Sequence, residues 1–195
     1  FLSRLNKQLL PFPAVAILGG SGAKGTWLKN AHDVDIFVLF PLQKYSSSSD
    51  KLSELLLPTV KKAFPGKRER LHGSRDYFRL QFQNLHFEIV PILHIKTARE
   101  ALNITDVSPL HSIWVNKHTK KLKDDILLAK QFCRAQRLYG AESYIQGFSG
   151  YVLEILIAQY GSFPGLLEAA QRWGIRDVVD VEIEGLGKLS NPVKM

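Results

Sequence analysis

The sequence predicts an α+β protein, with a mixed β-sheet and flanking helices in its first half and a helical second half. The first observation is a pair of alternating polar and apolar runs, 76–82 and 85–93, separated by Gln83 and Asn84, a pattern typical of a β-hairpin. The second is a change to helical spacing of the apolar residues from about Leu93 onward. The third is a series of glycines that follow the periodic segments of the second half, where they would end helices.

The elements follow from the same rules, taken in chain order. Apolar periodicity predicts a first helix, which Pro11 and Pro13 end, and the β-branched and aliphatic runs predict strands. Asp50 is expected to cap the helix that it precedes, and Pro58 to distort that helix. The expected strands are 14–18, 34–40, 76–82 and 85–93, and the expected helices are 1–10, 52–64, 108–118, 124–138, 148–160 and 164–173.

These elements predict three domains. A mixed-sheet domain is expected over residues 1–94 and a helical domain over 95–174. The segment 175–195 is expected to contain a strand that enters a further domain, truncated or missing here.

The composition is that of a globular chain with excess positive charge. Its 195 residues are 45% hydrophobic, and 26 Lys and Arg against 18 Asp and Glu give a net charge of +8. A basic surface suits a polyanionic partner without naming it. The single cysteine, Cys133, excludes an internal disulfide and is typical of a reducing compartment, so a cytoplasmic location is expected. No apolar run approaches the roughly 20 residues of a membrane span, so no membrane partner is expected.

The first candidate functional segment is glycine-rich and covers residues 19–28, GGSGAKGTWL. A dinucleotide fold would place its acidic residue about 20 positions later, and a Walker A loop would need a Gly-Lys-Ser/Thr triplet, so neither is predicted. What remains is a turn at a helix start, where the backbone at Gly20, the Ser21 hydroxyl and the Lys24 ammonium can converge on phosphate oxygens. The alternative is a tight turn that needs glycine only for its backbone angles.

Asp33 and Asp35 begin an otherwise apolar strand, and alternate residues of a strand share a face. Their carboxylates therefore point the same way and repel each other unless a cation neutralises them. Glu88, among apolar neighbours on a second strand, is the candidate for a third acid, and such oxygen ligands suit Mg²⁺. Taken alone, Glu88 could instead be a structural residue paired with Arg79 or Lys24.

Several motifs in a fixed order give the sequence a family resemblance. The string G-S-x-A-K-G-T followed by D-x-D-I resembles the polymerase-β-type nucleotidyltransferase superfamily, which implies that the mixed sheet is a polymerase-β-like palm. With FEIVP, SPLHSIW, LLAKQFCRAQRLYGAE and GFSGYVLEILIAQYGSF, the chain closely resembles archaeal-type (class I) CCA-adding tRNA nucleotidyltransferases. The resemblance runs from about Gly19 to Trp173, which is most of the chain.

The resemblance implies a role for each matching residue. Asp33, Asp35 and Glu88 would be the catalytic metal ligands and would hold a pair of Mg²⁺ ions. Without the resemblance, Lys130 could be a solvated helix residue and Tyr139 a core aromatic residue. The implied nucleotide-binding residues are Gly20, Ser21, Lys24, Ser108, His111, Lys130 and Tyr139.

Two departures from the family pattern stand out. Gly22 replaces a residue that is usually bulkier, and Glu88 replaces the more usual aspartate, which moves the carboxylate by about one methylene. The body and tail domains of the family are absent or only begun. The protein is therefore expected to be a minimal enzyme, to obtain the missing domain from a homodimer or a partner chain, or to have lost it.

The resemblance implies addition of C and A to the 3′ end of tRNA from CTP and ATP, by two-metal phosphoryl transfer with release of pyrophosphate. The basic stretches 61–70 and 117–123 would follow RNA phosphates, or would be solvated faces. One alternative is a nucleotidyltransferase of other specificity, which adds A or U to RNA or modifies a protein or small molecule. Another is a catalytic half that needs a partner chain. A third is a non-catalytic RNA-binding relic, against which the intact D-x-D argues.

Overall fold

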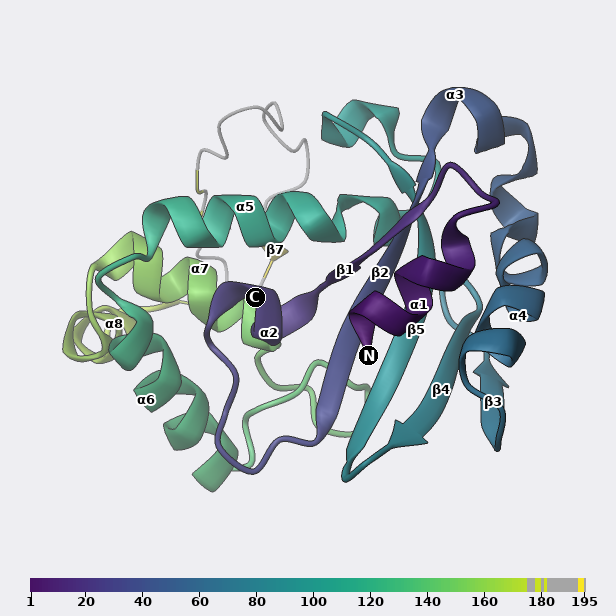
Figure 1. Cartoon of the computed structure of the whole chain (residues 1–195). Helices are drawn as coiled ribbons and strands as arrows, with labels where there is room; N and C mark the ends of the chain where they lie inside the picture. The colour runs from purple at the N-terminus through teal and green to yellow at the C-terminus, as the bar shows by residue number, and fades with distance from the viewer. Residues whose placement is uncertain (175–177, 180, 182–192, 195) are drawn as a thin grey trace. The chain divides into compact units, whose positions relative to one another are not determined.

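The computed structural model describes residues 1–174, 178, 179, 181, 193 and 194 (Figure 1). The chain falls into two compact units, each with its own apolar core. The first unit comprises Phe1–Ala23 and Asn30–Leu110, and the second comprises Lys24–Lys29 and His111–Met195.

The first unit contains a mixed five-stranded sheet with the strand order β1-β2-β5-β4-β3. β2 and β5 are parallel, and the other neighbouring strands are antiparallel. The predicted hairpin is confirmed, since β4 and β5 pair as far as Phe82 and Leu85, on either side of the turn. The strands are β1 (Val15–Leu18), β2 (Asp33–Pro41), β3 (Arg68–Leu71), β4 (Tyr77–Phe82) and β5 (Leu85–His94).

Helices α1 (Leu2–Leu9) and α4 (Leu52–Ala63) bury their apolar sides against one face of this sheet. Strand alternation divides the residues of β2 between the two faces. Ile36 and Val38 join the core with these helices, whereas Phe37 and Leu39 form a smaller cluster on the opposite face. The odd-numbered residues of β2, Asp33 and Asp35 among them, therefore face away from α1 and α4.

The segment before α4 differs from the prediction. Residues predicted as a loop form a short helix α3 (Leu42–Tyr45) and a 3₁₀ segment η1 (Ser46–Lys51). Asp50 is not the cap of α4, because the chain is already helical at that residue; the cap position is Lys51, whose side chain makes no capping hydrogen bond. The helix continues through Pro58, packed against α1 and β5.

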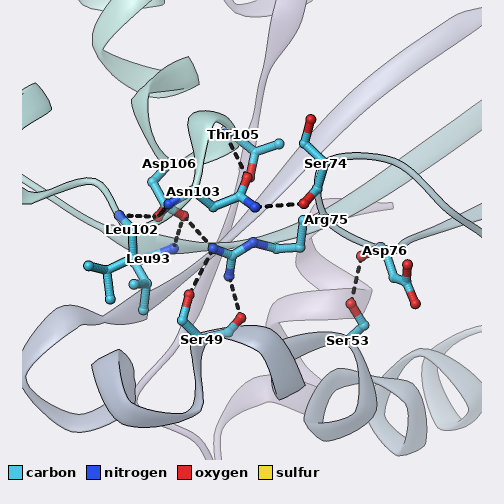
Figure 2. A network of polar contacts seen from close by, with 10 residues as sticks. All are labelled: Ser49, Ser53, Ser74, Arg75, Asp76, Leu93, Leu102, Asn103, Thr105 and Asp106. Atoms are coloured by element: carbon cyan, nitrogen blue, oxygen red, sulfur yellow. Dashed lines mark hydrogen bonds and ion pairs between the residues drawn. The ribbon is translucent and has the colours of Figure 1, made fainter.

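A buried polar network ties the connection between β3 and β4 to the end of β5 (Figure 2). Arg75 donates to the backbone oxygen of Ser49 at 2.9 Å and to the carboxylate of Asp106 at 3.0 Å. Asp106, in η3 (Ile104–Val107), also accepts from the backbone N–H of Leu93 at 2.9 Å. Burial lowers the pKa of Arg75, and the charge of Asp106 opposes that effect. The contacts hold these loops without involving the predicted site residues.

The second unit is helical, as predicted. This unit begins within α5, at His111, and also contains α6, α7 and α8. Its apolar core includes Ile126, Leu153 and Ile157. α6 ends before the predicted residue 138, since Arg137 adopts a φ of 60°. α7 begins after the predicted residue 148, because Ser149 caps it by accepting from the N–H of Val152. The helices are α5 (Ser108–His118), α6 (Lys123–Ala135), α7 (Gly150–Tyr160) and α8 (Phe163–Ala170).

The compact units divide the chain after Leu110, and residues 98–110, with η2 (Ala98–Glu100) and η3, belong with the sheet. The proposed domains 1–94 and 95–174 stay predictions. The start of a further domain expected over 175–195 lies largely outside the described residues. Of the residues that are described there, β6 (Val178–Val179) and β7 (Val193–Lys194) pair antiparallel.

Candidate active site

Three carboxylates share the sheet face opposite α1 and α4. Asp33 begins β2, and Asp35 follows on the same face. In the parallel pair of β2 and β5, Asp35 lies directly beside Glu88. Burial, reinforced by the charge of Asp35, raises the pKa of Glu88. The fold thus brings together the three acids that the sequence singled out.

Arg79 of β4 lies beside Glu88 in the antiparallel pair of β4 and β5. Its guanidinium donates to Asp33 at 3.0 Å, and its Nε lies 3.6 Å from the carboxylate of Glu88. The hydrogen bond with Asp33 raises the pKa of Arg79. The Arg79 guanidinium therefore partly neutralises the carboxylates. Of the two ion-pair partners considered for Glu88, Arg79 and Lys24, the structure places Arg79 beside it.

Gly20 and Ser21 lie at the start of the short helix α2 (Gly20–Lys24), which follows β1. The N–H of Gly19 donates to the backbone oxygen of Asp35 at 2.8 Å. Gly20 has a φ of +52°, and a β-carbon added there would collide with the carboxylate of Asp35. Glycine is thus required both for its backbone angle and for the space that Asp35 occupies.

Lys24 and Lys130 meet on a single buried carboxylate in the second unit. Glu154 of α7 is 1% exposed; its Oε2 accepts from Lys24 at 2.8 Å and its Oε1 from Lys130 at 2.7 Å. Thr26 donates its hydroxyl to the same Oε1 at 2.6 Å. The two lysines predicted to bind phosphate are 7% and 1% exposed, so neither is a solvated helix residue.

His111 and Tyr139 belong to the same cluster. The His111 ring stacks on Tyr151 with centroids 4.0 Å apart, and the Lys24 ammonium lies 5.0 Å from the centre of the Tyr151 ring. Burial, helped by the charge of Lys24, lowers the pKa of His111 to about 4, so this imidazole is neutral at pH 7. A β-carbon added at Gly150 would lie 2.9 Å from the Tyr139 hydroxyl and 3.4 Å from the Lys130 ammonium. Ser108 opens α5 in the first unit and is half-buried.

Most of the chain matches known protein families in sequence. Residues 2–137 match the nucleotidyltransferase domain, and residues 124–194 match the second domain of tRNA nucleotidyltransferase. The chain belongs to the nucleotidyltransferase family. The predicted α+β class with a polymerase-β-like palm is thereby confirmed.

This nucleotidyltransferase is similar to archaeal proteins named CCA-adding enzyme, as the sequence motifs predicted. It is 41% identical to the CCA-adding enzyme of Nanoarchaeum equitans over 171 residues. This match covers 85% of this chain and 41% of the relative. It is 36% identical over 179 residues to that of Methanothermobacter thermautotrophicus, covering 90% of this chain and 39% of the relative. The chain thus spans about two fifths of the length of these relatives.

Solved structures share the fold. The Escherichia coli MS115-1 CdnC in complex with HORMA-deltaN has a TM-score of 0.66 at 20% identity, over 97% of this nucleotidyltransferase and 70% of that chain. Cid1 in complex with its short product ApU has a TM-score of 0.56 at 18% identity, over 80% of this chain and 43% of that one. In the described part of the nucleotidyltransferase, no helix is long and apolar enough to cross a membrane.

A groove of about 360 Å³ adjoins the carboxylates of this nucleotidyltransferase on the first unit. Arg79, which pairs with Asp33, is one of its walls. Cationic side chains outnumber the single acid, Glu69, so the groove suits a negatively charged ligand. The lining residues are Lys67, Arg68, Glu69, Arg79, Leu80, Gln81 and His86.

The three acids have the donor chemistry of a magnesium site, since carboxylate oxygens are the ligands that Mg²⁺ prefers. Burial is the main cause of the raised pKa of Glu88, and the charge of Asp35 adds to it, so a divalent cation beside these acids would offset the part that is due to charge. Among the described residues, no three His, Cys, Asp or Glu side chains are already arranged around one metal position. Arg79 lies among the carboxylates instead.

Sequence reasoning missed Glu154. It stands in the apolar stretch GYVLEILIAQY, where an unpaired charge would be costly, and that argument had already selected Glu88. What the sequence could not supply was the partner, because Lys24 and Glu154 are 130 positions apart.

Proposed function

We propose that this chain transfers nucleotides from CTP and ATP to the 3′ end of tRNA and completes the CCA sequence. The observation that carries the proposal is the pairing of Asp35 with Glu88 across parallel strands, with Asp33 on the same face. The similarity to archaeal CCA-adding enzymes supports tRNA as the acceptor. We propose a cytoplasmic location, since the buried free thiol of Cys133 is typical of a reducing compartment.

Asp33, Asp35 and Glu88 would hold a pair of divalent cations, for which we propose Mg²⁺. Such cations lower the pKa of the attacking hydroxyl and offset the charge of the pyrophosphate that leaves. The carboxylates fix the position of the reacting groups on a rigid sheet, so catalysis rests on positioning and electrostatics. The RNA 3′-hydroxyl attacks the α-phosphate and displaces pyrophosphate, with no covalent enzyme intermediate.

The residues singled out by the family resemblance are proposed to bind the incoming nucleotide. Ser21, with the backbone at Gly20, would donate hydrogen bonds to phosphate oxygens, and Lys24 and Lys130 would offset their charge. His111, neutral at pH 7, would act as a hydrogen-bonding group rather than as a cation. The remaining proposed nucleotide contacts are Ser108 and Tyr139.

The acceptor strand is proposed to lie in the cationic groove beside the carboxylates. Lys67, Arg68 and Arg79 of this groove would contact phosphates, which are the charged groups common to every RNA. Whether the chain binds tRNA alone, as a homodimer or with a partner chain is part of the same proposal.

The test is incorporation of labelled CTP and ATP, with Mg²⁺, into tRNA transcripts that end before CCA, after C or after CC. Ordered addition of C, C and A to tRNA, and none to an unrelated RNA, is the expected result. Addition of A or U to any RNA would show a different specificity. A folded protein that modifies none of these acceptors would overturn the proposal for the chain alone.

Asp35→Ala is the matched variant for the chemistry. It removes one of the paired carboxylates, and we expect incorporation to fall by at least about 1,000-fold while the circular dichroism spectrum is kept. The exposed Asp50 of η1 gives the control, because Asp50→Ala removes the same group outside the acidic face. Activity that survives Asp35→Ala would show that the carboxylates do not carry the reaction.

A further inference from the structure

Arg79 contacts two of the carboxylates that are proposed to hold divalent cations. Its Nη2 donates to Oδ1 of Asp33 at 3.0 Å, and its Nε lies 3.6 Å from Oε1 of Glu88. Strand pairing places it there, because Arg79 and Glu88 are direct neighbours in β4 and β5. A carboxylate oxygen that accepts from a guanidinium has fewer lone pairs left for a metal ion, and two positive groups beside the same acids repel each other. Arg79 and a divalent cation therefore compete for these acids.

The contacts of Arg79 with the acids are weak enough to be exchanged. The Arg79 side chain is 39% exposed and that of Asp33 is 60% exposed. Ion pairs with this exposure contribute little to stability. The buried Nε has no hydrogen-bond partner among the residues that the structure describes, since the carboxylate of Glu88 is too distant. The acids therefore hold Arg79 by one good hydrogen bond and one long ion pair.

The same guanidinium is a wall of the cationic groove on the first unit. His86, another wall, lies beside Asp33 in the pairing of β2 with β5, so the groove begins where the acidic face ends. Lys67 and Arg68 supply further positive charge to this groove. All of these residues belong to the first unit. From one backbone position, the Arg79 side chain thus borders both the carboxylates and the space proposed for RNA.

We propose that Arg79 is an exchangeable counter-ion, which pairs with Asp33 and Glu88 in the metal-free protein and contacts an RNA phosphate in the groove once these acids hold divalent cations. The inference rests on the proposed function, which supplies the cations and the RNA. It reconciles the two contacts of Arg79, with the acids in the structure and with phosphate in the proposed complex, by assigning them to different states.

Charge balance explains why Arg79 would change its partner. A guanidinium is not deprotonated in proteins, so Arg79 keeps its charge in both states. Beside a divalent cation that charge is repelled, whereas a phosphate offers the paired oxygens that a guanidinium binds best. Because one ligand releases Arg79 and the other takes it up, each ligand should raise the affinity for the other.

The first test measures binding of Mn²⁺, a probe of the metal site, from the electron paramagnetic resonance signal of the free ion, without nucleotide or RNA. Arg79→Gln removes the competing charge, so we expect Mn²⁺ to bind about 10-fold more tightly than to wild type. Arg79→Lys keeps the charge but loses the planar fork, and should bind Mn²⁺ about 3-fold more tightly. Asp35→Ala should weaken binding by at least about 10-fold, which would assign the signal to the acidic face.

The second test measures the affinity for a short fluorescent single-stranded RNA by anisotropy, with and without Mn²⁺ at constant ionic strength. In wild type, Mn²⁺ should raise RNA affinity by about 5-fold or more. In Arg79→Gln the gain should fall below about 2-fold, because the residue that couples the two ligands is absent. Lys67→Gln is the matched control, since it removes a groove charge that contacts none of the three acids. It should bind RNA more weakly and keep the full gain from Mn²⁺.

The outcomes separate the two proposals, with circular dichroism to check that each variant is folded. If both Arg79 variants bind Mn²⁺ like wild type, or if Arg79→Lys does so while Arg79→Gln binds more tightly, the exchange is wrong. Full retention of the Mn²⁺ gain by Arg79→Gln would also overturn it. In each case, Mn²⁺ binding that depends on Asp35, together with incorporation by the wild type, would still support the proposed function. If neither wild type nor Arg79→Gln binds Mn²⁺, both proposals are overturned.

Discussion

Gly20 shows how one residue without a side chain can set the position of a neighbouring carboxylate. Its φ of +52° belongs to the left-handed region, and the space that a β-carbon would take is filled by the carboxylate of Asp35. The same loop donates an N–H from Gly19 to the backbone of Asp35. The glycine-rich segment thus contacts the acidic strand directly, in addition to any contact with phosphate.

Gly20→Ala should therefore damage activity more than stability. The left-handed backbone costs an alanine about 1–2 kcal/mol, and the added carbon must also displace Asp35. A displacement of about 1 Å at a catalytic group can reduce the rate by about 100-fold, which is the loss we expect in incorporation assays. Gly161→Ala is the control, since Gly161 has a φ of +75° with no atom within 4 Å of the added carbon. Similar losses of activity in the two variants would show that strain alone is responsible.

At the same scale, the sequence predicted the acids better than their surroundings. Asp33, Asp35 and Glu88 could be found because charges in apolar strands are costly and strand periodicity fixes their face. The environments of Lys24 and Lys130 could not be predicted, since their shared partner, Glu154, comes from a helix that is distant in the sequence. Local patterns identify which groups are unusual, and only the fold identifies what neutralises them.

At the scale of elements, the turn of the β4–β5 hairpin holds a residue in an unfavourable conformation. Gln83 has a φ of 55°, which glycine adopts readily and other residues adopt at a cost. The hairpin places Arg79 and Glu88 opposite each other, so its register bears directly on the acidic face. The polar and apolar alternation of both strands, rather than the turn, must therefore fix that register.

Gln83→Gly should stabilise the protein by about 0.5–1 kcal/mol, because relief of the left-handed strain exceeds the extra entropy of glycine in the unfolded chain. Urea denaturation should show a higher midpoint with an unchanged slope. Asn84, the other turn residue, does not have a positive φ. Asn84→Gly should accordingly lower stability by a similar amount, and a gain from both variants would contradict the explanation.

The elements that the sequence failed to predict share a physical reason. β3 has the sequence RERL, in which charge hides any alternation, and it lies at the edge of the sheet where polar residues are tolerated. η1 is built from four serines and Asp50-Lys51, a composition typical of a loop. In contrast, α5 extends over the predicted Ser108–His118, where Pro109 fits the first turn of a helix.

At the scale of the whole molecule, net charge is the property that bears on function. The chain carries a formal charge of +8. A groove with several cationic walls adjoins the acidic face, so charge attracts the acceptor where the chemistry is proposed. Lys67, Arg68 and Arg79 of this groove are the contacts that we propose for holding RNA.

RNA binding should therefore depend steeply on salt, and Lys67 should account for part of the slope. Its side chain is 91% exposed, and its ammonium lies 3.8 Å from Glu69 in a weak surface pair. If Lys67 contacts one phosphate, Lys67→Gln should reduce the slope of log K against log salt by about 0.7–0.9. The measurement is filter binding of a tRNA transcript between about 50 and 200 mM salt.

Lys7→Gln, at an exposed lysine of α1 outside the groove, changes the net charge equally and should leave the slope unchanged. An equal decrease in both variants would show that overall charge, rather than the groove, holds the RNA.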